Sequence, residues 1–118
     1  MFNLMLVTAI ALTLCPVGPR DNCVHDGDTF WLHGEKIRIA DIDTPELNGD
    51  CPAERRLAVK ARDRLVMLLR RDYQVLRQGK DRYGRTLAIV TVDGRSVGDQ
   101  LVREGLARTW SGRREPWC

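Results

Sequence analysis

The sequence predicts one α+β domain, built as a small barrel of short strands with helices inserted between them. The chain has 118 residues, which is enough for one compact domain with a single hydrophobic core. Short runs of β-branched and aromatic residues are bounded by turn signals, as is typical of strands. Several short strands with two inserted helical segments favour a small barrel over a parallel sheet.

The first strands are predicted in the N-terminal half. Asp26-Gly27 is a strong tight-turn signal, and residues 29–32 (TFWL) have the composition of a strand. After a second turn at Gly34, residues 36–42 alternate between apolar and polar side chains, which predicts another strand. Pro45 ends this strand because proline cannot donate a hydrogen bond to a sheet.

A basic amphipathic helix is predicted for residues 53–71. Asp50 or Cys51 can cap it, and Pro52 fits its first turn. Its inward face carries apolar residues at helical spacing, namely Leu57, Ala61, Leu65 and Leu68 or Leu69. The rest of the helix is rich in arginine. A solvent-exposed surface explains this basic face more simply than insertion into a groove of nucleic acid.

The second half adds two strands and a short helix. Residues 73–78 and 86–94 have strand composition and are joined by the loop 79–85. Residues 96–109 predict an amphipathic helix that stops at Gly105. The tail that follows is expected to be irregular, with its tryptophans folded back as a lid on the core.

Residues 1–15 contain no charged side chain. This run is too short to cross a bilayer, which takes about 20 apolar residues. It resembles a secretory signal core with a small-x-small cleavage site at Ala9–Ala11, although no Lys or Arg precedes it. Alternatively, residues 11–15 form a first strand. We therefore assign residues 1–20 to a signal peptide or N-terminal strand and residues 21–118 to the domain, and we expect a secreted or periplasmic protein, otherwise a cytoplasmic one.

The four cysteines are Cys15, Cys23, Cys51 and Cys118. They contain no CxxC pair, which disfavours a zinc site. An even number in an exported small domain favours disulfides. Three full pairings are compatible with the sequence, and a bridge at Cys118 would pin an end that otherwise frays.

Charge is divided unevenly along the chain. Residues 1–50 carry three basic and eight acidic side chains, whereas residues 51–118 carry 16 basic and eight acidic ones. A basic body with a local acidic pocket suits a polyanion ligand together with a bound cation, and a solvated mixed-charge surface is the simpler alternative.

The carboxylates of Asp28, Asp43 and Glu46 are the candidate acidic pocket. If neighbouring strands bring them together, two like charges ~4 Å apart repel by ~4 kcal/mol at an effective dielectric of about 20. Such a cluster takes up protons, spreads apart or binds a cation. Oxygen ligands with no histidine or cysteine nearby favour Ca²⁺ or Mg²⁺ over zinc.

Two arginines lie near these carboxylates: Arg38 is in the predicted strand that leads to Asp43, and Arg85 is at the head of another predicted strand. A guanidinium grips phosphate oxygens with a planar fork that lysine cannot copy. A cation beside two such forks is the arrangement that phosphoryl chemistry requires, with a carboxylate to activate water. The alternative is that both arginines form surface ion pairs with Asp41 or Asp81.

Three motifs in order closely resemble the thermonuclease (staphylococcal nuclease-like) family: "VHDGDTFWLHGEKIRIADIDTPE", "DRYGRTLAIV" and "LVREGLA". The resemblance covers residues 23–108. It implies an α+β fold, a five-stranded OB-fold Greek-key barrel with two to three packed helices. The implied site consists of Ca²⁺ ligands Asp28, Asp43 and Thr44 (through its backbone carbonyl), catalytic residues Arg38, Glu46 and Arg85, and substrate-binding residues Arg82 and Tyr83.

The resemblance also implies a function. We expect a monomeric Ca²⁺-dependent endonuclease that hydrolyses DNA and RNA with little sequence specificity and leaves 3′-phosphate ends. One alternative is a non-catalytic OB-fold module that binds nucleic acid or a protein partner, motivated by the basic helix and the terminal tryptophans. Another is a cation site with a purely structural role. The chain stops soon after the third motif, so we expect a minimal domain without further substrate-stacking aromatics.

Overall fold

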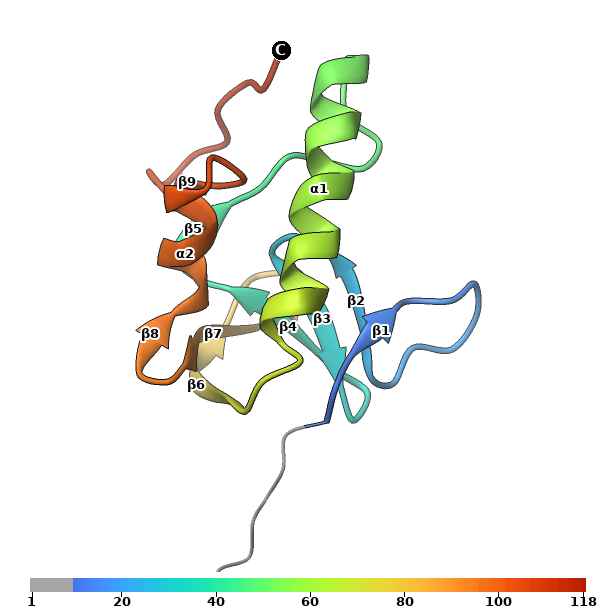
Figure 1. The fold of residues 1–118 in the computed structure, drawn as a ribbon, viewed down its shortest axis with the longest axis vertical. Helices are drawn as coiled ribbons and strands as arrows, with labels where there is room; N and C mark the ends of the chain where they lie inside the picture. The colour runs from blue at the N-terminus through green and yellow to red at the C-terminus, as the bar shows by residue number, and fades with distance from the viewer. Residues whose placement is uncertain (1–9) are drawn as a thin grey trace, which may run out of the picture.

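The structure is a computed structural model that describes residues 10–118 (Figure 1). Most of the predicted signal core, residues 1–9, lies outside the described residues, as does the first position of the proposed cleavage site. Neither helix in the described part of the chain is long and apolar enough to cross a membrane.

A seven-stranded sheet forms the centre of the fold. Its five longer strands lie in the order β2 (Cys23–Asp26), β3 (Thr29–Leu32), β4 (Glu35–Ile39), β7 (Thr86–Val92) and β6 (Tyr73–Lys80). β4 and β7 run parallel, and the other neighbours among these five are antiparallel. The two short strands of this sheet are β1 (Thr13–Leu14), parallel to β2, and β8 (Arg95–Ser96), antiparallel to β7.

The predicted α+β class is confirmed, and the five longer strands are those expected for an OB-type barrel. Within residues 10–118, β1 and β6 remain edges of the sheet, so hydrogen bonding does not close it into a complete barrel. A separate two-stranded sheet pairs β5 (Ile42–Asp43) with β9 (Arg108–Thr109). This small sheet joins the segment that carries Asp43 to the start of the C-terminal tail.

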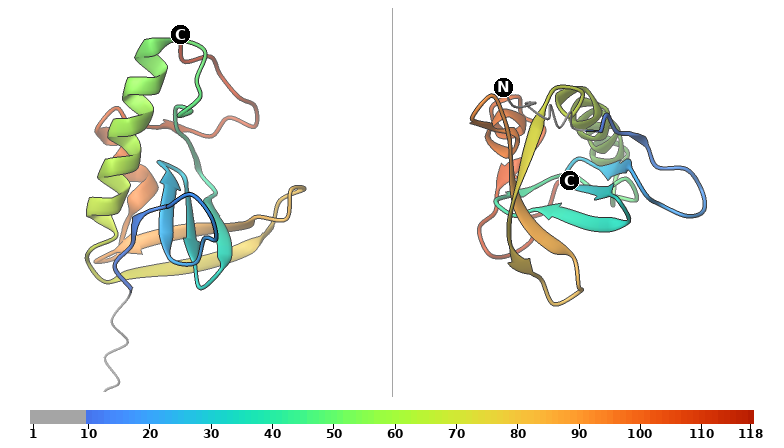
Figure 2. Two further views of the ribbon diagram at one scale, coloured as in Figure 1. Left: turned by 90° about the vertical axis from the view of Figure 1, so that its right-hand side faces the viewer. Right: turned by 90° about the horizontal axis from the view of Figure 1, so that it is seen from below.

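The described residues contain two helices, α1 (Pro52–Leu68) and α2 (Val97–Arg103). α1 packs against β2, and α2 packs against β7. The N-terminal end of α1 extends beyond the sheet and lies beside the C-terminal tail (Figures 1 and 2). The β6–β7 hairpin projects on the other side, so its tip stands clear of the neighbouring strands (Figure 2).

The hydrophobic core lies between the main sheet and the two helices. The predicted alternation in β4 is confirmed, because Ile37 and Ile39 are both fully buried. Ala61 and Leu65 of α1 are also fully buried, as the helical spacing predicts. The other large core members are Leu12, Val24, Phe30, Ile42, Leu69, Val90 and Leu101.

The predicted strand over residues 36–42 is wrong in one respect, because it is broken into β4 and β5. The interruption falls at Ala40 and Asp41, where the Ala40 N–H donates to the carbonyl of Ala88 at 2.9 Å. The Arg38 side chain donates to the Ile39 carbonyl and, at 2.8 Å, to the Ile42 carbonyl. Arg38 thereby satisfies carbonyls on both sides of the break, which redirects the chain toward the site.

Both predicted helices are shorter in the structure than in the sequence pattern. α1 ends at Leu68 rather than residue 71, and α2 covers Val97–Arg103, ending two residues before the predicted stop at Gly105. Gly105 takes a φ of 75° directly after α2, a conformation that glycine adopts without strain. The chain then becomes β9 instead of continuing as helix.

Two disulfides select one of the three pairings that the sequence left open: Cys15–Cys23 and Cys51–Cys118. The first joins the residue after β1 to the start of β2. Leu12 belongs to the core, so the residues around β1 form an N-terminal strand of the fold. The second disulfide joins the residue before α1 to the C-terminal tail.

Candidate functional site

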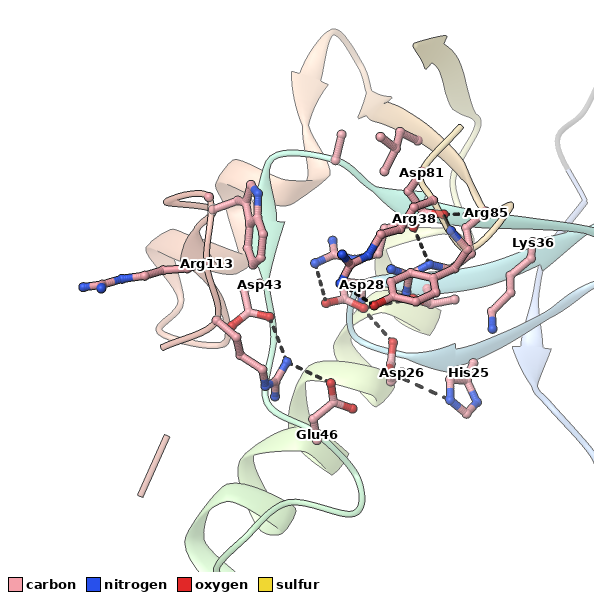
Figure 3. Close-up of a pocket in the computed structure, with 18 residues that line it drawn as sticks. His25, Asp26, Asp28, Lys36, Arg38, Asp43, Glu46, Asp81, Arg85 and Arg113 are labelled. Carbon is pink, nitrogen blue, oxygen red and sulfur yellow. Dashed lines mark hydrogen bonds and ion pairs between the residues drawn. The ribbon is translucent and has the colours of Figure 1, made fainter. Parts of the chain in front are cut away.

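Side chains from separate segments of the chain meet in one pocket of about 990 Å³ (Figure 3). The predicted site residues that line it are Asp28, Arg38, Asp43, Glu46, Arg82, Tyr83 and Arg85. Thr44 is buried, and it joins the site through its backbone N–H, which donates to Asp28 Oδ2 at 3.2 Å. The tertiary structure therefore brings the predicted residues together.

The turn between β2 and β3, which carries Asp28, packs against α1 because Gly27 has no side chain. A Cβ at Gly27 would lie 2.8 Å from the Cβ of Ala61 and 3.0 Å from the Cγ2 of Thr44. Real Cβ atoms do not approach so closely, so the turn can pack on α1 and on the segment after β5 only with glycine here. This contact sets the position of the first carboxylate.

Asp28 is held by three neighbours. Its Oδ1 accepts a hydrogen bond from the Thr29 hydroxyl at 3.0 Å, and its Oδ2 accepts the Thr44 N–H. The guanidinium of Arg38 forms an ion pair with Oδ2 at 3.4 Å. Asp28 is only 7% exposed, so these contacts fix its orientation inside the pocket.

Asp43 ends β5, and Glu46 follows it after Pro45. Asp43 is 4% exposed, whereas the Glu46 side chain is half exposed. Burial raises the pKa of Asp43, with a further contribution from the Asp28 charge, while Arg114 acts in the opposite direction. Partial burial likewise raises the pKa of Glu46, with the paired Arg114 acting in the opposite direction and the charges of neighbouring carboxylates adding to the increase. These carboxylates are therefore close enough to repel one another.

Asp26 is a further acidic residue that lines the pocket. From the sequence it was predicted only as part of a tight turn. It is buried, and its Oδ1 accepts the Asp28 N–H at 3.2 Å. Burial, reinforced by the neighbouring Asp28 charge, raises the pKa of Asp26 to about 8. The direction of this shift favours the protonated form of Asp26, because two carboxylates this close repel one another when both are ionised.

The two predicted arginines have different partners. Arg38 is largely buried and pairs with Asp28, not with Asp41 as the alternative predicted. Arg85 pairs with Asp81 at 2.7 Å, as the alternative predicted, yet it also lines the pocket. Both guanidinium groups therefore face the same space as the carboxylates.

Arg82 and Tyr83 lie at the tip of the β6–β7 hairpin. The Arg82 guanidinium donates to the Tyr83 hydroxyl at 2.7 Å, and the guanidinium groups of Arg82 and Arg85 lie over its ring. Tyr83 is 68% exposed, so its ring is available at the mouth of the pocket. The Asp81 side chain accepts backbone N–H groups from Tyr83 and Arg85 and shapes this tip.

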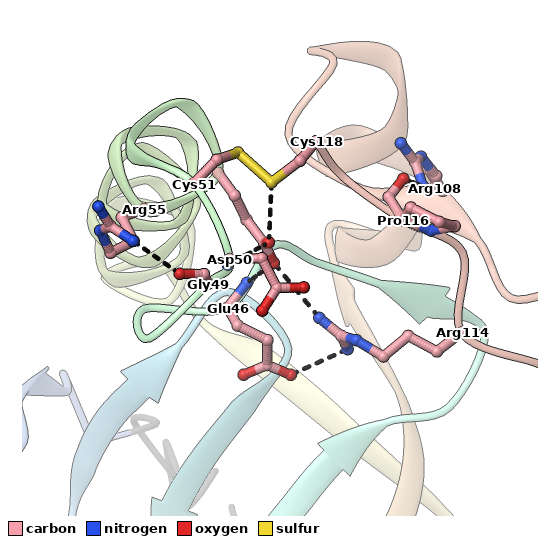
Figure 4. The surroundings of a disulfide bond; sticks show 10 residues. Glu46, Gly49, Asp50, Cys51, Arg55, Arg108, Arg114, Pro116 and Cys118 are labelled. Carbon is pink, nitrogen blue, oxygen red and sulfur yellow. Dashed lines mark hydrogen bonds and ion pairs between the residues drawn. A yellow bond between two sulfur atoms is a disulfide. The ribbon is translucent and has the colours of Figure 1, made fainter.

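Arg114, Trp117 and Glu54 are site residues that the sequence pattern did not indicate, and Figure 4 shows Arg114 beside Glu46. Arg114 forms ion pairs with Asp43, Glu46 and Glu54, and the Trp117 indole donates to Asp43. The predicted lid of tryptophans on the hydrophobic core is wrong, because the tail lies over carboxylates instead. The sequence feature that could have indicated this arrangement is Cys51, the cysteine before α1. Its disulfide with Cys118 brings the C-terminal tail next to these carboxylates.

A hard dication fits the chemistry of this pocket, because it holds several mutually repelling carboxylates and an arginine already neutralises part of their charge. Within the described residues, no group of three or more His, Cys, Asp or Glu side chains has a metal-holding arrangement. Asp28 and Asp43 are buried carboxylates of the pocket that could serve as ligands to such a cation.

The model of the family described as staphylococcal nuclease homologues matches residues 36–116. The chain belongs to this family. The match contains every predicted site residue except Asp28, and it includes Arg114. The matched region runs from β4 into the C-terminal tail and contains most of the residues that line the pocket.

Three curated relatives are endonucleases or nucleases by name. An uncharacterized endonuclease of Haemophilus influenzae is 31% identical over 90 residues, which cover 71% of this chain and 47% of the relative. A micrococcal nuclease of Shigella flexneri is 35% identical over 102 residues (75% and 54%). Endonuclease YncB of Bacillus subtilis is 37% identical over 91 residues (70% and 43%). The chain spans about half the length of these relatives.

Proposed function

We propose that this chain is a Ca²⁺-dependent endonuclease, a phosphodiesterase that hydrolyses DNA and RNA with little sequence preference and leaves 3′-phosphate ends. The observation that carries the proposal is the meeting of two arginines with three carboxylates around one pocket, namely Arg38, Arg85, Asp28, Asp43 and Glu46. Family membership and the nuclease names of the relatives support the same reaction class.

In this proposal Asp28, Asp43 and the backbone carbonyl of Thr44 hold the Ca²⁺ ion. The bound ion would supply neutralisation of the phosphate charge and orientation of the attacking water. Asp28 is fixed for this role by Thr29 and by the Thr44 N–H.

Arg38 and Arg85 bind the phosphate oxygens in this proposal. Arg38 is already oriented by the carbonyls of Ile39 and Ile42, so little side-chain freedom is lost on binding. Arg85 stands at the base of the projecting hairpin tip, where Tyr83 and Arg82 contact the next part of the substrate. The two guanidinium groups would stabilise negative charge that develops on the phosphate in the transition state.

Glu46 is the proposed general base. It takes a proton from water, and the water oxygen attacks the phosphorus in line with the P–O5′ bond. That bond breaks, its electron pair leaves with O5′, and O5′ takes a proton from solvent to become a hydroxyl. The phosphate remains on the 3′ oxygen. The raised pKa of Glu46, caused mainly by burial, makes its carboxylate a better proton acceptor.

The basic remainder of the chain supports the choice of a polyanionic substrate. Residues 51–118 carry twice as many basic as acidic side chains, 16 against eight. Such an excess raises the local concentration of nucleic acid and makes binding sensitive to salt. We also propose that the protein acts as a monomer in a secreted or periplasmic location, where its two disulfides persist.

The test is digestion of plasmid DNA, single-stranded DNA and RNA by the purified chain, with Ca²⁺ or with excess chelator. We expect cleavage only with Ca²⁺, and products that accept a 3′ label only after phosphatase treatment. Glu46→Gln, Arg38→Ala and Arg85→Ala should each lose about 10²-fold or more in rate. Arg56→Ala, on the exposed face of α1, is the matched control and should cleave normally.

Digestion that survives excess chelator, or that is unchanged in both arginine variants, would contradict the proposal. Salt-sensitive binding with no cleavage in any divalent metal would instead indicate the non-catalytic nucleic-acid-binding alternative. A rise in melting temperature with Ca²⁺ and no hydrolysis would indicate a purely structural cation site.

A further inference from the structure

The guanidinium of Arg114 bridges three carboxylates, two in the proposed metal pocket and one beside it; Figure 4 shows its ion pair with Glu46. Its Nη1 lies 2.9 Å from Glu46 Oε1 and 3.3 Å from Asp43 Oδ1. Its Nη2 lies 3.5 Å from Oε2 of the buried Glu54. A single side chain of the C-terminal tail, which we define as residues 110–118, thus neutralises part of the negative charge around Asp43.

The tail also engages the second oxygen of Asp43. The Trp117 Nε1–H donates to Asp43 Oδ2 at 3.3 Å. Both oxygens of this carboxylate are therefore in contact with the tail, one with the guanidinium and one with the indole. A cation that binds Asp43 has to share a carboxylate oxygen with one of these two groups or displace it.

The tail is fixed on both sides of Arg114. At its start, β9 pairs with β5 and the Trp110 N–H donates to the carbonyl of Asp41 at 2.9 Å. At its end, the disulfide joins Cys118 to Cys51, the N-cap residue of α1. In addition, the Arg108 guanidinium lies 3.7 Å from the ring centroid of Trp117 and donates to the Pro116 carbonyl at 2.8 Å. Such a tether holds Arg114 near Asp43 at a high effective concentration.

We propose that Arg114 is a tethered cation that competes with the divalent ion for Asp43, and that the Cys51–Cys118 disulfide sets the strength of this competition. The proposal rests on the proposed function, since it requires Ca²⁺ to bind at Asp43. Two positive groups on the same carboxylate repel one another, so binding of the ion and docking of Arg114 oppose each other. The Arg114 side chain is 45% exposed, which lets it swing into solvent while the tail stays attached.

The first test is calorimetric titration of Ca²⁺ into the full chain after its metal has been removed by chelation. Arg114→Ala should lower the Ca²⁺ dissociation constant about fivefold or more. Arg113→Ala is the matched control, because it removes the same charge from the same tail. Arg113 is 81% exposed, pairs with Glu115 and points away from the carboxylates (Figure 3), so its loss should change the affinity less than about twofold.

The second test removes the tether. The double variant Cys51→Ser/Cys118→Ser should also bind Ca²⁺ more tightly, and adding Arg114→Ala to it should give no further gain. Cys15→Ser/Cys23→Ser controls for the loss of a disulfide away from the tail and should leave the affinity near that of the wild type. Melting curves show whether each variant is folded, and Arg114→Ala alone keeps both disulfides.

Equal or weaker Ca²⁺ binding by Arg114→Ala than by the wild type overturns the competition, even if the chain is an active Ca²⁺-dependent nuclease. Tighter binding by Arg114→Ala with no change in the cysteine double variant overturns the role of the disulfide. If the wild type and Arg114→Ala both fail to bind Ca²⁺, the proposed metal site itself is wrong, and the competition falls with it.

Discussion

The buried carboxylate of Glu54 accepts a hydrogen bond from the backbone N–H of Glu46 at 3.0 Å. Its other oxygen accepts the N–H of Asp50 at 3.1 Å. Glu54 lies in the first turn of α1. Its carboxylate accepts hydrogen bonds from two backbone N–H groups that precede the helix. These hydrogen bonds fix the loop that carries Glu46, the proposed general base. These N–H hydrogen bonds lower the pKa of Glu54, so it stays ionised.

We predict that Glu54→Ala lowers the free energy of unfolding by about 1–3 kcal/mol, because two N–H groups lose their acceptor. It should also lower kcat more than it raises KM, since Glu46 is no longer held in place. Glu54→Gln keeps one acceptor oxygen, so its losses of unfolding free energy and of kcat should both be smaller than those of Glu54→Ala. Urea unfolding and steady-state nuclease assays measure these effects. An alanine variant as stable as the wild type would show that the loop is held by other contacts.

Gly27→Ala should destabilise the protein by about 1–3 kcal/mol, because the added Cβ meets Ala61 and Thr44 within 3.0 Å or less. Ala61→Gly alone should cost about 1 kcal/mol through helix propensity. In the double variant the methyl group of residue 61 is gone and no longer obstructs the new methyl group at residue 27. The loss of unfolding free energy in the double variant should therefore be smaller than the sum of the losses in the two single variants. Thermal or urea unfolding of the four proteins measures this coupling. Strict additivity would contradict the close packing of the turn on α1.

Glu35 provides a prediction about pH at a point remote from the pocket carboxylates. Hydrogen bonds from Arg77 and from the Thr86 hydroxyl lower the pKa of Glu35 from 4.5 to about 2. A carboxyl group whose pKa is lower in the folded state stabilises the fold above its unfolded pKa and loses this contribution as the pH falls through the folded value. Its contribution is therefore full at pH 7 and disappears between pH 4.5 and about 2.

We predict that Glu35→Gln is less stable than the wild type by about 0.5–1 kcal/mol at pH 7, a small value because solvent screens this partly exposed pair. The difference should vanish on acidification. Urea unfolding at several pH values measures it. Asp93→Asn, which removes an ion pair of two well exposed side chains, serves as the comparison and should have little effect at any pH. A difference for Glu35→Gln that persists unchanged at low pH would contradict the assignment.

Lysine substitutions should affect catalysis equally at the two site arginines but should destabilise the fold more at Arg38 than at Arg85. Arg38→Lys and Arg85→Lys should each lower kcat/KM about 10²-fold, because lysine cannot form the planar fork. Arg38→Lys should also destabilise the fold by about 1–2 kcal/mol, because the carbonyls of Ile39 and Ile42 lose a donor. Arg85→Lys breaks a pair at the hairpin tip and should cost less than about 1 kcal/mol. Equal stabilities of the two variants would contradict this difference.

Much of the fold follows from local patterns in the sequence. The alternation around Ile37 and Ile39 predicts the buried face of β4, and helical spacing predicts that Ala61 and Leu65 of α1 are inward. The break at Ala40 and Asp41 was missed because it depends on a long side chain that satisfies two carbonyls, which no periodicity encodes. β9 was missed for a similar reason, since a two-residue strand exists only where its partner β5 lies.

The types of residue in the candidate site were determined by the sequence alone. The motifs around Asp28, Asp43, Glu46 and Arg85 place carboxylates and arginines at the ends of strands, because short strands and turns are local structures. Only the tertiary structure decided which cysteines pair and that Arg114 reaches Asp43. Both features depend on the packing of an irregular tail beside the N-terminal end of α1. Arg114 and Asp43 are 71 positions apart in the sequence, and a contact over that distance produces no local sequence pattern.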